Sequence, residues 1–115
     1  SVALLLISAC AAAPIAPTAE LQAAASAIKA AEQARVADYA SPDLAEARNK
    51  LNAANASLQL KEMDMARRLA EQARVDADLA LARSQATKAK VVNDEMLKGT
   101  QSLKQEMQRT TGEQQ

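Results

Sequence analysis

Three leucines spaced seven residues apart, Leu44, Leu51 and Leu58, constrain the fold of this chain more than any other feature. Ala47 and Ala54 lie between them, so large and small side chains alternate at the a and d positions of a heptad repeat. Such a stripe makes one face of an α-helix apolar, and a second helix has to cover it. The small residues let two helix axes approach toward the short end of the usual range of about 8–10 Å.

Composition supports an all-α fold over the whole chain. The 115 residues are rich in alanine and include one aromatic side chain, two glycines and three prolines, all three before position 43. Alanine favours helix and β-branched or aromatic residues favour strand, so the balance is strongly helical. We therefore predict an antiparallel, alanine-rich helical hairpin or three-helix bundle with a long, overhanging third helix.

Local signals divide the helical part into three segments. Thr18 is the predicted N-cap of a first helix that runs to about Ala40, and Ser41-Pro42-Asp43 has the hydroxyl, proline and carboxylate typical of a second helix start. The expected core stripe of the first helix is Leu21, Ala24, Ala25, Ile28, Ala31 and Tyr39. Glu46 and Lys50 are correctly spaced for an ion pair on the outer face of the second helix.

The leucine register is lost around residues 61–64, where Asp64 could cap a third helix that begins at Met65. The alternative is a helix that continues through this point as one long rod and must oligomerise. The apolar face of the third segment is expected to pack against the leucine stripe of the second. We expect the third helix to weaken at Gly99. This face is made of Ala66, Leu69, Ala70, Ala73, Ala77, Ala80, Leu81 and Ser84.

The N-terminal residues have the pattern of an export signal. Residues 2–9 form an uncharged apolar run that is too short to span a bilayer and ends in small residues before Cys10. Ile7-Ser8-Ala9-Cys10 resembles the bacterial lipobox, in which the chain is cleaved between Ala9 and Cys10 and the cysteine thiol carries lipid. By the same resemblance, Ala11 in place of an acidic residue points to the outer membrane, facing the periplasm. The alternative for Cys10 is a small buried core residue.

These boundaries define four parts of the chain. Residues 1–9 are the signal-peptide remnant, residues 10–17 a lipidated tether punctuated by Pro14 and Pro17, residues 18–98 the helical domain, and residues 99–115 a weakly helical or disordered tail.

The stretch from about Tyr39 to Ala86 resembles a known envelope family, the domain of unknown function 4398. The likeness lies in Tyr39-Ala40-Ser41-Pro42-Asp43-Leu44-Ala45-Glu46-Ala47, in Leu58, and in Ala66-Arg67-Arg68-Leu69-Ala70-Glu71-Gln72-Ala73 with Asp76-Ala77. The resemblance implies a helical module that commonly follows a lipobox, and it brings no catalytic residues. Some members continue into a peptidoglycan-binding domain of the outer-membrane-protein-A type, and this sequence ends before one.

The chemistry of the side chains argues against catalysis. Histidine is absent and the single cysteine is the predicted lipid site, so we expect no catalytic triad, no metal site and no cofactor apart from the covalent lipid on Cys10. The 14 basic and 14 acidic residues alternate along the chain, and this pattern does not favour nucleic acid. A small-molecule substrate is not expected either.

Two roles fit these observations. The first is a structural or interaction module of the envelope, anchored by its lipid, that binds an envelope protein or its own copies. Its helix seam would be Leu44, Ala47, Leu51, Ala54, Leu58, Leu69 and Ala73, and its partner contact Val91, Met96, Leu103 and Met107. The second is a periplasmic binding or chaperone-like module that shelters an apolar ligand or client between its helices.

Overall fold

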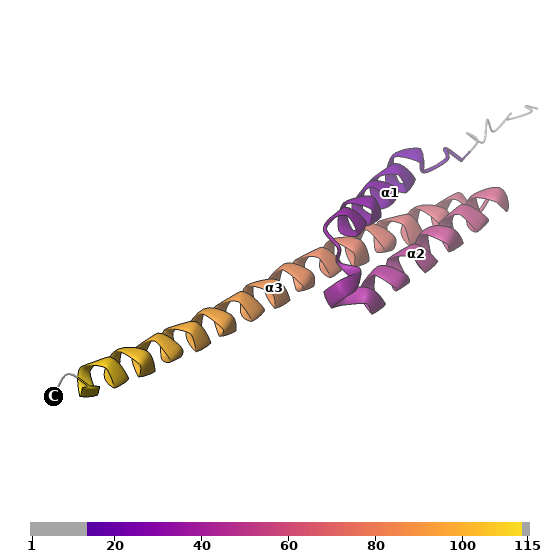
Figure 1. Ribbon diagram of the computed structural model, residues 1–115. Helices are drawn as coiled ribbons and strands as arrows, with labels where there is room; N and C mark the ends of the chain where they lie inside the picture. Colours follow the sequence, from indigo (N-terminus) through magenta and orange to yellow (C-terminus); the bar gives the residue numbers. More distant parts are fainter. Residues whose placement is uncertain (1–13, 114–115) are drawn as a thin grey trace, which may run out of the picture.

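The computed structural model describes residues 14–113, which form three α-helices joined by short connections. Helix α1 spans Thr18–Gln33, α2 spans Ala37–Gln59 and α3 spans Met63–Glu113. Figure 1 shows α1 and α2 lying along the first half of α3, while the second half of α3 extends away from them. The predicted all-α class with a long C-terminal helix is confirmed.

One face of α3 forms the centre of the packing between the three helices. Its buried residues recur every three or four positions, the spacing that places side chains on one side of a helix. They are Ala66, Ala70, Ala73, Ala77, Ala80 and Ser84. From α1, Ile28 and Ala31 pack in one cluster with Leu44 and Ala47 of α2, and this cluster includes Ala77 and Ala80. Because most of these side chains are methyl groups, the core is thin and the helices lie close together.

Helix α1 ends at Gln33, seven residues before the predicted end at Ala40. Arg35 adopts a left-handed φ of 56°, and the amide of Val36 donates to the carbonyl oxygen of Ala31 at 3.1 Å. This is the hydrogen bond of a Schellman motif, in which glycine usually takes the left-handed position. Val36 and Ala31 are both fully buried in the same cluster, so apolar burial offsets the strain at Arg35.

The start of α2 contains a kink at Ala40, whose φ of −142° and ψ of 42° are not helical. The predicted helix start at Ser41 therefore lies one residue after a real break in the backbone. Pro42 is tolerated here because the first amides of a helical segment have no partner in the preceding turn. A short helical turn from Ala37 precedes the kink.

The turn between α2 and α3 ends the helix where the leucine register is lost. Lys61 has a left-handed φ of 62°, and the amide of Glu62 donates to the carbonyl oxygen of Ser57 at 2.9 Å, a second Schellman motif. The alternative of one continuous rod is therefore wrong. Helix α3 begins at Met63 and not at Met65, so Asp64 lies in its first turn and is not the cap.

Helix α3 continues unbroken through Gly99 to Glu113, and the expected weakening after Lys98 is wrong. The residues beyond Gly99 are mostly good helix formers, and one glycine costs only about 1 kcal/mol relative to alanine. Thr100 and Thr110 also donate their hydroxyls to the carbonyl oxygens of Met96 and Glu106. Every residue from 89 to 113 is exposed. We call residues 89–113 the free segment and residues 18–88 the packed region.

Three details of the first helix differ from the sequence prediction. Pro17, not Thr18, occupies the N-cap position, and no side chain caps the helix. Ala25 and Tyr39 are exposed, whereas Ala24, Ile28 and Ala31 are buried as expected. The predicted signal-peptide remnant and the lipid site Cys10 lie outside the described residues. None of the helices within residues 14–113 is both long enough and apolar enough to span a bilayer.

Candidate interaction surface

The four residues predicted to contact a partner are all exposed on the free segment. The exposed fraction is 41% for Val91, 66% for Met96 and 61% for both Leu103 and Met107. Met96, Leu103 and Met107 are seven and four residues apart, so they share one side of the helix. Val92, which is 53% exposed and four residues before Met96, belongs to the same side. We call these four residues, Val92, Met96, Leu103 and Met107, the exposed stripe.

Val91 lies on a different side of α3 from the exposed stripe. When the heptad spacing of the buried face is continued beyond Ser84, the next positions are Thr87, Val91, Asp94 and Lys98. The positions after Val91 are polar. The free segment therefore does not extend the seam of the packed region. Most of its large apolar side chains form a separate stripe in a different register, and the predicted contact residue Val91 lies outside that stripe.

The predicted seam residues lie between the helices. Leu44, Ala47, Ala54 and Ala73 are buried, and Leu51, Leu58 and Leu69 are half-buried. Leu51 packs against both core clusters, and Leu69 packs against the second cluster, which contains Ala54 and Ala73.

An ion pair between α2 and α3 lies at the edge of this seam. The Nζ atom of Lys50 is 2.6 Å from Oδ2 of Asp76 and 3.8 Å from Oε1 of Glu46. The hydrogen bond that Lys50 donates to Asp76 raises the pKa of Lys50 above its usual value of 10.5. The sequence predicted only the Glu46 pair on an outer face, because a partner 26 residues away is set by the packing of α2 on α3.

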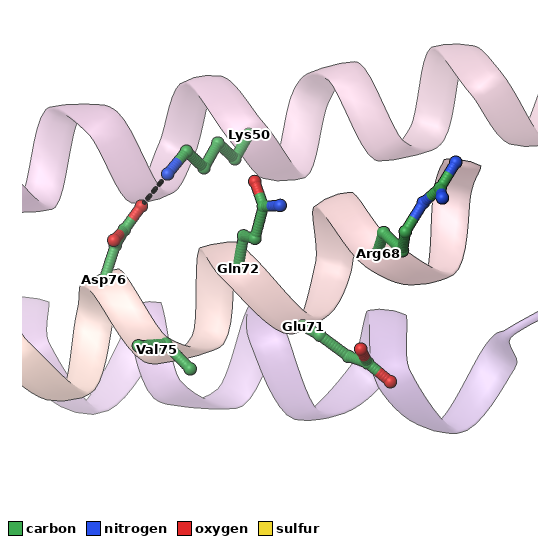
Figure 2. Close-up of a pocket in the computed structure, with 6 residues that line it drawn as sticks. All are labelled: Lys50, Arg68, Glu71, Gln72, Val75 and Asp76. Carbon is green, nitrogen blue, oxygen red and sulfur yellow. Dashed lines mark hydrogen bonds and ion pairs between the residues drawn. The ribbon is translucent and has the colours of Figure 1, made fainter. Parts of the chain in front are cut away.

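Figure 2 shows the depression around this ion pair, lined by Arg68, Glu71, Gln72 and Val75 together with Lys50 and Asp76. Lys50 reaches toward Asp76, while the side chains of Arg68 and Glu71 point away from the pair and from each other. The polar groups do not converge on one point where a ligand atom could sit. Within residues 14–113 there is also no group of three side chains placed to hold a metal ion.

Two further ion pairs join the helices at the surface of the packed region. Arg48 of α2 lies 2.7 Å from a carboxylate oxygen of Glu32 in α1, and Arg83 of α3 lies 2.8 Å from one of Asp43 in α2. Each such exposed pair is worth about 0–1 kcal/mol, so they orient the helices more than they stabilise them. Every pair of helices is thus linked by packing or charge, while the free segment lacks any such contact with α1 or α2.

These features define a class of protein: an all-helical chain whose first two helices pack along a third, which then projects beyond them with an exposed apolar stripe. The chain belongs to the family described as "Domain of unknown function (DUF4398)", whose profile matches residues 19–96. The match takes in α1, α2 and α3 as far as Met96, and the resemblance seen in the sequence is confirmed. No curated protein and no solved structure matches this chain.

Proposed function

We propose that this chain is an outer-membrane lipoprotein that faces the periplasm and acts as a non-catalytic interaction module of the bacterial envelope. In this proposal the packed region is an antiparallel three-helix bundle that holds α3 rigidly. The free segment then binds an envelope protein or a second copy of the chain. The observation that carries the proposal is the exposed stripe on a helix that neither α1 nor α2 covers.

The exposed stripe has the form of a helix-in-groove ligand. A helix recognised in this way presents apolar anchors at intervals of three, four and seven residues along one side. Val92, Met96, Leu103 and Met107 follow this spacing. Methionine side chains adapt to irregular apolar surfaces, which suits two of the four anchors.

The packing of the core favours this role over a module that shelters an apolar ligand. Seam alanines such as Ala54 and Ala73 are fully buried by direct contact between helices. An apolar ligand needs a concave site with room between side chains, whereas alanine seams draw helix axes together. The depression in Figure 2 contains one aliphatic side chain, Val75, among four charged side chains and one amide.

A photo-cross-linking amino acid in living cells tests the partner contact. Placed at Lys104, beside the exposed stripe, it should capture a specific protein or a second copy of the chain. The matched control is Asn52, an exposed position on α2 in the packed region. Adducts from Asn52 alone would contradict the proposal, as would a partner that still co-purifies with a chain truncated at Lys90.

The lipid anchor is tested separately through Cys10→Ser. We expect the substitution to abolish incorporation of labelled palmitate and to release the protein from the membrane fraction. If the label persists on the variant, or if the variant still sediments with outer membranes after a salt wash, the lipobox interpretation is wrong.

A further inference from the structure

Exposed apolar side chains also gather at the end of the molecule opposite the free segment, around the turn between α2 and α3. Leu60, the C-cap residue of α2, is 71% exposed, and Met65 in the first turn of α3 is 43% exposed. Ile15, in the extended segment before α1, is 91% exposed. We call these three residues, together with Lys61, the turn end.

The N-terminal segment leaves the molecule at this same end. Residues 15–17 line a single pocket with Met63, Asp64 and Arg67, so the segment lies against the start of α3. Figure 1 shows the chain entering α1 beside the turn that joins α2 to α3. Pro14 is therefore at the turn end. Cys10 is four residues before Pro14, and four residues of fully extended chain span at most about 14 Å.

We propose that the turn end rests on the lipid bilayer that holds the acyl chains of Cys10, with Leu60 and Ile15 entering its interfacial layer. This inference rests on the proposed lipid anchor. A tether of at most about 14 Å holds the turn end near the membrane surface. Apolar side chains at that surface gain by leaving water, and the long stem of Lys61 can lie against the bilayer while its ammonium stays in water.

The charges near the turn end indicate which force holds it there. Lys61, Arg67 and Arg68 are balanced by Glu20, Glu62 and Asp64. A polybasic patch attracts anionic lipid, but a balanced surface does not. The contact should therefore depend on the apolar side chains and change little between neutral and anionic vesicles.

This arrangement also determines how far from the membrane surface the free segment can bind a partner. Helix α3 begins at the turn end, and the free segment starts 26 residues later, about 39 Å along the helix at a rise of about 1.5 Å per residue. The helix carries the exposed stripe away from the packed region and away from the turn end (Figure 1). The partner should accordingly be reached in the periplasm and not at the membrane surface.

The experiment uses the full, acylated chain in vesicles of phosphatidylethanolamine and phosphatidylglycerol. Acylation blocks the thiol of Cys10, so Leu60→Cys supplies the only free thiol for an environment-sensitive fluorophore. Met107→Cys is the matched control at the far end of α3. Adding lipids that carry a nitroxide on the acyl chain should quench the fluorophore at position 60 and leave the one at position 107 unchanged.

A second pair of variants tests whether Leu60 itself makes the contact. With the fluorophore at Met65→Cys, adding Leu60→Gln should reduce the quenching, and folding should be unaffected because Leu60 is exposed. If mass spectrometry shows acylated Cys10 but positions 60 and 107 are quenched equally, the membrane contact is wrong and the anchor stands. If Cys10 carries no lipid, the anchor is wrong and this inference fails with it.

Discussion

Lys88 of α3 donates a hydrogen bond of 2.9 Å from Nζ to the backbone carbonyl oxygen of Ala34, the C-cap residue of α1. The last carbonyl groups of a helix have no partner within it and carry the negative end of the helix dipole, so a lysine ammonium is well suited to this position. The same ammonium lies 5.6 Å from the centre of the Tyr39 ring. Lys88 is half-buried and every residue from 89 to 113 is exposed, so this contact marks the end of the packed region.

Replacing Lys88 with methionine should destabilise the packed region by about 1 kcal/mol. The variant keeps the apolar stem of the side chain but leaves the carbonyl group of Ala34 without its donor. Urea denaturation followed by circular dichroism measures the change. Lys90→Met, at an exposed position on the free segment, is the control and should have no effect; an equal loss in both variants would contradict this role of Lys88.

Ala54→Leu should be more destabilising than Ala53→Leu. Ala54 is fully buried in the seam and Ala53 is exposed. Extra methylene groups in a close-packed core typically cost about 1–3 kcal/mol, and an exposed leucine on a helix costs little. Thermal melts compare the two variants directly, and equal midpoints would show that the heptad assignment is wrong.

The ion pair between Lys50 and Asp76 should make stability depend on pH in the alkaline range. The pKa of Lys50 is raised in the folded chain above the usual 10.5, so its stabilising contribution is complete below pH 10.5 and is lost as the pH rises through the raised pKa. Wild type should therefore exceed Lys50→Met in stability at pH 8, and this advantage should shrink well above pH 10.5. The control, Lys98→Met, should follow wild type at both pH values in urea denaturation.

Ser84→Ala should stabilise the packed region by about 1 kcal/mol. The hydroxyl of Ser84 is buried and has no hydrogen-bond partner within the described part of the chain. A buried polar group without a partner costs free energy that a methyl group does not. Calorimetric melts measure the gain, with the exposed Ser102→Ala as the control; a lower midpoint for Ser84→Ala would indicate that the hydroxyl has a stabilising partner.

Gly99→Ala should stabilise the free segment by about 0.5–1 kcal/mol and leave the packed region unchanged. A Cβ atom at Gly99 would meet nothing within 4 Å, and alanine loses less backbone entropy than glycine on helix formation. Hydrogen exchange of the amides near Met96 and Leu103 should slow. The control, Gly112→Ala, should have a smaller effect because it lies near the frayed end of the helix. Unchanged exchange near Leu103 would contradict a continuous helix there.

Local periodicity along the chain was enough to predict several features of the fold. The spacing of Leu44, Leu51 and Leu58 predicted a helix with one apolar face, and the loss of that register predicted a break within residues 61–64. The buried face of α3 was also predictable, because residues three and four apart lie on one side of any α-helix. The family could be recognised from the same pattern of alanine and leucine.

Features that depend on contacts between residues far apart in the chain could not be predicted from local periodicity. Helix α1 ends early because Val36 becomes buried against residues of all three helices. This burial offsets the strain of the left-handed conformation at Arg35, a position where the sequence has no glycine to indicate a helix end. Asp76 became the partner of Lys50 because the packing of α2 on α3 brings together two residues that lie 26 positions apart in the chain. The free segment begins after Lys88 because α1 ends beside Lys88, whose ammonium contacts Ala34. A contact between residues so far apart in the chain cannot be predicted from the local sequence.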